Sequence, residues 1–173
     1  MQKAASRESR GKETENITLY AIIRLRGRVN VNPEVKKTLE LLRLTRKYSL
    51  AIYPSDIPGL EGMLKKVKDW VTWGEIDRDT LKILLERRGR TPGNRRLTEK
   101  YIRDEMGLKD MEELVEKIFR GEILLHKQNH IKPIFRLHPP SGGFKRSIKR
   151  PFRDQGELGY RGPLINELIR RMA

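Results

Sequence analysis

The chain has 173 residues, enough for one medium domain or two small ones with a sizeable core. Its 38 Lys and Arg outnumber 23 Asp and Glu, and the net charge of +15 favours a polyanionic partner. Because cysteine is absent, disulfides, thiolate nucleophiles and Cys-based metal sites are excluded, and a reducing, cytoplasmic setting fits. Apolar stretches are short and the N-terminus is polar, so we expect a soluble protein with neither a membrane span nor a secretory signal.

The excess charge is uneven and divides the chain into four segments. Residues 1–16 carry +1, residues 17–75 carry +5, residues 76–122 carry +1, and residues 123–173 carry +8. The first segment is polar and predicts a flexible tail. The others predict an α+β core, a helical segment with a basic loop, and short strands with a basic extension and a terminal helix.

The core pattern begins with apolar residues that alternate over 17–25, the period of a strand with one buried face. Asn32 is placed to cap a helix whose first residue is Pro33. A second alternating run at residues 48–52 predicts another strand.

The core pattern continues with a second helix. Ser55 or Asp56 is placed to cap it, and its apolar residues lie between Ile57 and Val67. Residues 70–75 predict a third strand. The order strand, helix, strand, helix, strand predicts a small βαβαβ two-layer core with helices on one face of the sheet.

Three short helices are expected in residues 76–122, each opened by a capping side chain and closed by glycine. The cap and the closing glycine are Asp77 or Asp79 and Gly89 for the first helix, Thr98 and Gly107 for the second, and Asp110 and Gly121 for the third. Farther on, residues 123–125 and 134–137 predict short strands. Residues 139–160 are rich in Gly and Pro without a usable period, and Pro163 marks the start of a last helix.

The residues give little support to catalysis. His126, His130 and His138 are clustered, but they lack the converging partners that a zinc site needs. Asp154 and Glu157 lie among arginines, which favours ion pairs over acid–base chemistry. We therefore expect no enzyme, no metal, no cofactor and no small-molecule substrate.

Three basic clusters favour nucleic-acid binding instead. The candidate contacts are Arg24, Arg26, Arg28 and Asn30; Arg87, Arg88, Arg90, Arg95 and Arg96; and Phe144, Lys145, Arg146, Lys149, Arg150, Phe152 and Arg153, with Arg161 added. Guanidinium groups engage phosphate oxygens in pairs, and aromatic rings between basic residues can stack on unpaired bases. The alternatives are a solvated basic face, and phenylalanines that anchor the extension on the core.

Two other functions stay open from the residues alone. Thr98 to Phe119 can be drawn as a helix-turn-helix unit of a DNA-binding protein, although Glu112, Glu113 and Glu116 would make its second helix acidic. An RNA-modifying enzyme would have to use a carboxylate in the region of Asp154 and Glu157.

A family resemblance favours one of these possible functions. Residues 23–29, followed by Thr38, Leu39, Leu42 and Leu44, and then Ile57 to Trp70, are similar to the universal large-subunit ribosomal protein thirty, whose eukaryotic members are numbered seven. Residues 144–160 resemble the longer archaeal form. The resemblance implies a ferredoxin-like core and a non-enzymatic structural constituent of the large ribosomal subunit. It also implies rRNA and neighbouring ribosomal proteins as partners, with the loop from Arg26 to Asn32 as an RNA contact.

Overall fold

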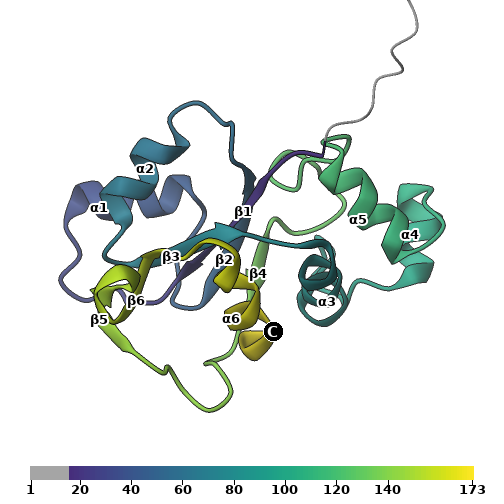
Figure 1. Ribbon diagram of the computed structural model, residues 1–173. Coiled ribbons are helices and arrows are strands. Elements are labelled where there is room, and N and C mark those ends of the chain that lie inside the picture. The colour runs from purple at the N-terminus through teal and green to yellow at the C-terminus, as the bar shows by residue number, and fades with distance from the viewer. Residues whose placement is uncertain (1–15) are drawn as a thin grey trace, which may run out of the picture.

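A six-stranded mixed sheet runs through the computed structural model, which describes residues 16–173 (Figure 1). The strands are β1 (Leu19–Arg24), β2 (Ser49–Pro54), β3 (Val71–Glu75), β4 (Ile134–Arg136), β5 (Ser147–Pro151) and β6 (Gly156–Tyr160). Their order across the sheet is β4-β2-β1-β3-β6-β5. The β1, β2, β3 and β4 pairings are antiparallel, whereas β6 is parallel to both β3 and β5.

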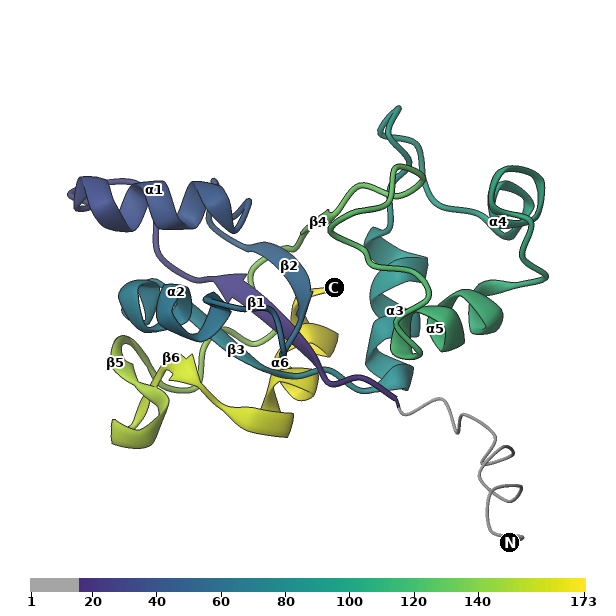
Figure 2. The same ribbon diagram turned by 90° about the horizontal axis from the view of Figure 1, so that it is seen from above.

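Helices cover both faces of this sheet (Figure 2). They are α1 (Pro33–Leu41), α2 (Leu60–Val67), α3 (Arg78–Arg88), α4 (Glu99–Met106), α5 (Met111–Phe119) and α6 (Ile165–Met172), with short 3-10 turns at Phe152–Asp154 and Gly162–Leu164. Ile22 of β1 packs with α1 and α2, while its neighbours Ala21 and Ile23 pack with α3, α5 and α6. Because successive side chains of a strand point to opposite faces of the sheet, β1 contributes residues to two separate cores.

The predicted core elements are present, with one shifted boundary. The Asn32 side chain accepts a hydrogen bond from the Glu34 amide, and Pro33 opens α1 as predicted. The second helix begins at Leu60 after Gly59, so the predicted caps at Ser55 and Asp56 are wrong. A helix cannot easily start earlier, because a residue that precedes proline, here Ile57 before Pro58, disfavours helical backbone.

The three predicted helices of the middle segment are confirmed together with their caps. The side chains of Asp77, Thr98 and Asp110 accept hydrogen bonds from backbone amides three residues ahead, at 2.7, 3.2 and 2.9 Å. Gly107 ends α4 with φ +67°, the left-handed conformation that glycine adopts without strain.

The C-terminal segment departs most from expectation. The strand predicted at residues 123–125 is wrong, because the Leu124 carbonyl accepts from the amides of Lys127 and Gln128 and so closes a turn. The strand predicted at residues 134–137 is present as β4, which ends one residue earlier, at Arg136. The stretch 139–160, which has no period in the sequence, contributes β5 and β6 to the sheet edge. Of the tail predicted at residues 1–16, all but Asn16 lies outside the described residues.

A close backbone approach joins this C-terminal segment to the core. A Cβ at Gly74 of β3 would lie 1.9 Å from the Gly162 carbonyl oxygen, so only glycine fits there. The Arg161 amide donates to the Trp73 carbonyl at 2.9 Å next to this contact. None of the helices in residues 16–173 is long and apolar enough to span a membrane.

Replacing Gly74 with Ala should therefore reduce the free energy of unfolding by about 1–3 kcal/mol, the usual cost of overpacking. Gly62→Ala in α2 is the matched control, because its added Cβ meets no atom within 4 Å and alanine favours the helix by up to about 1 kcal/mol. Guanidinium denaturation followed by circular dichroism measures both. Equal stability of Gly74→Ala and the parent chain would contradict the predicted close packing.

Candidate nucleic-acid interface

Arg24 holds together the two loops at one end of the sheet. Its guanidinium donates to the carbonyl oxygens of Arg26 at 2.9 Å, Gly27 at 3.1 Å and Leu44 at 2.7 Å. Only 4% of Arg24 is exposed, and this burial lowers its pKa, with Arg28 adding to the effect. These three bonds give Arg24 a structural role in holding the loops, and an RNA contact by its side chain stays a prediction.

The loop between β1 and α1 nevertheless presents the other residues expected there. Arg26 lies over the Trp70 ring at 5.4 Å from its centroid, and Arg28 donates to the Thr45 carbonyl at 3.0 Å. Arg28 and Asn30 are exposed, and Asn30 has φ +55° at the tip of the loop. This loop is thus fixed by hydrogen bonds to neutral carbonyl groups, which leave its positive charge uncancelled.

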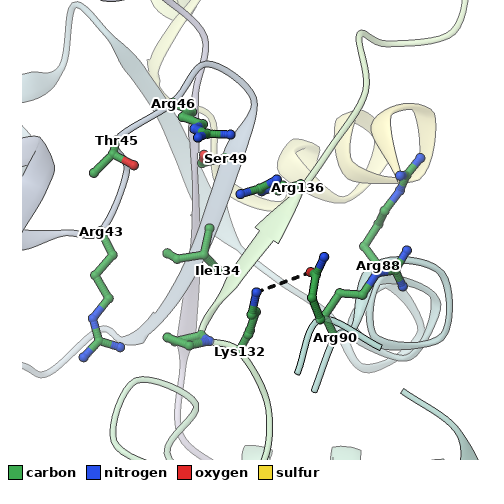
Figure 3. A pocket seen from close by; sticks show the side chains of 11 residues that line it. Arg43, Thr45, Arg46, Ser49, Arg88, Arg90, Lys132, Ile134 and Arg136 are labelled. Carbon is green, nitrogen blue, oxygen red and sulfur yellow. Dashed lines mark hydrogen bonds between the residues drawn. The ribbon is translucent and has the colours of Figure 1, made fainter. Parts of the chain in front are cut away.

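A groove beside β4 gathers positive charge from segments that lie far apart in the sequence. We call it the cationic groove; its volume is about 480 Å³, and its charged lining residues are Arg43, Arg46, Arg88, Arg90, Lys132 and Arg136. Figure 3 shows these side chains around the open space, with Arg43 and Arg46 on one side and Arg88 and Arg90 on the other. Ser49, Thr45 and Asn94 add polar groups, and no acidic residue lines the groove.

The cations of the cationic groove keep their charge available. None of the six forms an ion pair with a carboxylate in residues 16–173. Lys132 donates to the Asn94 side chain at 3.3 Å, and Arg90 donates to the neighbouring Gly89 carbonyl at 3.1 Å. Like charges held this close repel one another, and an incoming polyanion would relieve that repulsion.

Three separate segments build the cationic groove. Arg43 and Arg46 lie in the loop between α1 and β2, while Arg88 and Arg90 lie at the end of α3 and in the hairpin that follows it. That hairpin pairs Arg90 with Arg96, and the Lys132 amide donates to the Arg90 carbonyl at 2.8 Å. Strand pairing thus brings the loops of the core and of the helical segment to one surface.

A second hollow continues the surface toward the β1 loop. It is lined by Arg24, Arg28, Asn30, Val31, Lys36, Glu40 and Thr45, and it shares Thr45 with the cationic groove. Two of the three predicted clusters therefore lie on one continuous surface. Arg87, Arg95 and Arg96 are exposed beside it, and their side chains form no ion pair with a carboxylate in the described part of the chain.

The third predicted cluster lies at the opposite edge of the sheet, on and around β5. Its exposed cations are Lys145, Arg146, Lys149, Arg150 and Arg153. Phe144 packs on Tyr48 with ring centroids 6.3 Å apart and joins the core. The Phe152 ring has the guanidinium carbons of Arg146 and Arg161 each 5.0 Å from its centroid. Both rings already have partners within the chain.

Arg161 differs from its neighbours because it is buried. Only 8% of the residue is exposed, and its guanidinium donates to the Glu157 carboxylate at 2.6 Å and to the Thr72 hydroxyl at 2.7 Å. Burial lowers its pKa, and Glu157 opposes that shift. Arg161 thus forms an internal ion pair, the pairing that the arginine-rich surroundings of Glu157 predict, while its RNA contact stays a prediction.

The histidines stand in unrelated surroundings. His126 packs against the Tyr53 ring at 5.3 Å, while the His138 ring is bonded to the carbonyls of Pro139 and Ala173. Within residues 16–173 no three His, Asp or Glu side chains converge on a point that could hold a metal ion.

The helices proposed for a helix-turn-helix unit are used for packing. Met111, Leu114, Val115 and Ile118 of α5 are buried in the core shared with α3. Two acidic residues of α5 are also paired with cations of α3: Glu112 pairs with Lys82 at 2.9 Å, and Glu116 pairs with Arg78. A recognition helix needs an exposed face of positive or neutral character, which α5 does not offer.

Sequence reasoning missed four cations of the cationic groove. Arg43 and Arg46 did carry a signal, because residues 43–47 hold three basic residues and no acid. Lys132 and Arg136 are isolated in the sequence, and only the pairing of β4 with β2 brings Arg136 opposite Ser49.

Comparison with known proteins gives a consistent result along the chain. The family Ribosomal protein L30p/L7e matches residues 20–71. A large ribosomal subunit protein uL30 from Hyperthermus butylicus is 60% identical, covering 98% of this chain and 99% of the relative. Those from Ignicoccus hospitalis and Aeropyrum pernix are 59% and 53% identical, each over 89% of this chain and 97% and 98% of the relative.

The chain belongs to the L30p/L7e family. It is accordingly a structural, non-enzymatic constituent of the large ribosomal subunit, as the resemblance implied, and it lies in the cytoplasm with that particle. The ferredoxin-like core with added helices agrees with the family as well. Membership removes the DNA-binding and RNA-modifying alternatives.

Arg24 offers a test of how the interface is held. Arg24→Lys should reduce the free energy of unfolding by about 1–3 kcal/mol, because lysine cannot serve all three carbonyls and leaves buried acceptors unsatisfied. Arg43→Lys is the control: it is exposed, and its effect should stay within about 0.5 kcal/mol. Chemical denaturation of both variants measures the difference. Equal effects would mean that Arg24 does not organise the loops.

Proposed function

We propose that this chain binds the RNA of the large subunit mainly through phosphates, using the cationic groove, the adjoining β1 loop and the basic strand β5. The observation that carries the proposal is the convergence of six cations from three chain segments on a groove without acids. The folded sheet sets the spacing of these groups. Neighbouring ribosomal proteins would meet the remaining surface.

The lining of the cationic groove favours phosphate contacts over base reading. Guanidinium groups bind phosphate oxygens in pairs, and the groove contains no aromatic ring on which a base could stack. In the third cluster, Phe144 lies in the core and Phe152 carries two guanidinium groups, so we propose that its cations, not its rings, make the RNA contacts.

The release of counterions supplies a quantitative expectation. Each phosphate that is neutralised adds about 0.7–0.9 to the slope of log K against log salt. With about six to ten phosphates engaged, the slope should fall between roughly −4 and −9. The groove and the β1 loop together offer enough cations that are at least partly exposed for the lower part of this range, and β5 extends it.

Removing three cations of the groove should weaken RNA binding beyond the effect of net charge. The variant Arg43→Ser, Arg46→Ser and Arg136→Ser should lose at least about tenfold in affinity, and its salt slope should shrink by up to about 3. The charge-matched control changes three exposed cations near α4, Lys100→Ser, Arg103→Ser and Lys109→Ser. Filter binding to large-subunit rRNA over a salt series compares them. If both triple variants lose the same affinity, the groove is not a specific contact.

The hairpin arginines should contribute to binding without supporting the fold. The variant that changes Arg87, Arg88, Arg90, Arg95 and Arg96 to Ser should bind rRNA more weakly, while its thermal midpoint stays nearly unchanged. Their only side-chain hydrogen bonds in the described residues go to backbone carbonyls, from Arg90 and Arg96, so little folding energy is lost. Thermal melting measured beside binding separates the two effects. Parallel loss of fold and affinity would show that these arginines are structural.

A further inference from the structure

A small pocket lies where the residues before β5 meet the end of β6 and helix α6. Its volume is about 160 Å³, against about 480 Å³ for the cationic groove, so it admits one small group and not a length of chain. We call it the β5–α6 pocket. It is lined by four cations, two carboxylates and three apolar residues: Lys145, Arg146, Arg161 and Arg171; Glu157 and Glu167; Phe152, Leu164 and Leu168.

Both carboxylates that line the β5–α6 pocket are already engaged by neighbours in the chain. One Glu157 oxygen accepts from the Arg161 guanidinium at 2.6 Å, and the other accepts from the Arg146 backbone amide at 3.1 Å. The Glu167 carboxylate lies 3.4 Å from the Lys145 ammonium at the exposed rim. These two ion pairs offset two of the four positive charges, and the other two remain.

Arg146 and Arg171 carry the remaining charge. Neither forms an ion pair with a carboxylate in residues 16–173. Arg146 is exposed, and its guanidinium carbon lies 5.0 Å from the centroid of the Phe152 ring. The Arg171 guanidinium donates to the carbonyls of Ser141 and Gly143. Because these acceptors are neutral, they orient Arg171 without cancelling its charge.

Arg161 is the buried cation of the β5–α6 pocket and still has one donor to offer. Its Nε and Nη2 donate to Thr72 and Glu157, whereas Nη1 has no hydrogen-bond partner in the described chain and keeps contact with solvent. Burial lowers the pKa of Arg161, Glu157 opposes that shift, and Arg146 and Arg171 lower the pKa further. Three guanidinium groups thus lie close enough to repel one another, and an anion between them would relieve the repulsion.

The lining of the β5–α6 pocket suits a phosphodiester. Phe152, Leu164 and Leu168 form an apolar side beside the cations, and Leu164 is 52% exposed. A phosphodiester brings a sugar to such a side, and guanidinium forks bind its oxygens in pairs. Strand β5 begins at Ser147, directly after Arg146, so the pocket adjoins the exposed basic strand of the proposed RNA surface.

We propose that the β5–α6 pocket binds a single phosphate of the large-subunit RNA. Arg146 and Arg171 are its main donors, the free Nη1 of Arg161 is the third, and the attached sugar packs against Phe152 and Leu164. The proposal deepens the proposed function and rests on it, because it names one phosphate site on the β5 side of the RNA surface.

A titration with a single phosphodiester tests the β5–α6 pocket without rRNA. The probe is the dinucleotide uridylyl-uridine, and a blocked glycine–aspartate–glycine peptide offers one carboxylate of the same charge. The readout is the Nε–H signal of Arg161 in the NMR spectrum of the nitrogen-15-labelled full chain, because this group is buried and bonded to Thr72. We expect a saturable shift with the dinucleotide, binding weaker by at least about tenfold after Arg146→Gln, and little response to the peptide.

Arg170→Gln is the matched control for this titration. It removes the same charge from an exposed position of α6 that does not line the β5–α6 pocket, and its ion pair with Asp77, at 3.8 Å, is exposed as well. This variant should bind the dinucleotide like the parent chain. Far-ultraviolet circular dichroism checks that both variants are folded.

Three results of the titration would overturn the proposal. The first is a dinucleotide that causes no saturable shift of the Arg161 signal. The second is equal weakening by Arg146→Gln and Arg170→Gln, which would indicate diffuse attraction to a basic surface. The third is tighter binding of the peptide than of the dinucleotide, which would indicate a site for an acidic protein segment.

Ethylation of rRNA phosphates provides a second test in the complex. Ethylating one particular phosphate should hinder binding of the parent chain but hardly affect Arg146→Gln, which has already lost that contact, while Arg170→Gln should keep the parent pattern. Identical patterns for the parent and Arg146→Gln would mean that the β5–α6 pocket holds no RNA phosphate. Variants of the cationic groove should change other phosphates, so failure here is distinguishable from failure of the groove contacts. If the chain bound no rRNA, the proposed function would fail, and the dinucleotide titration would still decide whether the pocket binds a phosphodiester.

Discussion

The interface depends on a buried arginine whose partners are all backbone carbonyls. Arg24 ties the loop after β1 to the loop after α1 without using a carboxylate, so the surface above it keeps its full positive charge. An ion pair in the same place would have fixed the loops but cancelled part of the charge. Arg161 differs, because Glu157 neutralises its charge and the resulting ion pair lies in the interior.

Local signals in the sequence were sufficient to predict most helices and the central strands. Asn32, Asp77, Thr98 and Asp110 each cap the helix that follows, because a cap requires only residues within one turn. The strand β6 could not be predicted in this way. Its pattern is weak, and it is held by pairing with β3, which lies more than eighty residues earlier in the chain.

In the candidate site, too, short runs of sequence indicate some residues, whereas others come together only through the pairing of distant strands. The clustered arginines of residues 87–96 and the β1 loop were visible as runs of charge, and the structure places both on one surface. Lys132 and Arg136 carry no such signal, since each stands alone in the sequence and joins the others only through β4 pairing. Charge density also could not show that Arg24 and Arg161 turn inward, because burial depends on the packing of distant segments.

The two parts of the proposed RNA surface, the cationic groove and β5, differ in how firmly the fold holds their cations before RNA binds. In the cationic groove, strand pairing and the hairpin hold the backbone of Arg90, Lys132 and Arg136 in place before RNA arrives, so binding orders only the ends of the side chains. The cations on β5 lie on an exposed edge strand, where long side chains lose more rotamer freedom for each phosphate contact. The same number of phosphate contacts would therefore contribute unequally to the binding free energy. Each cation of the groove should contribute more to RNA affinity than each cation on β5.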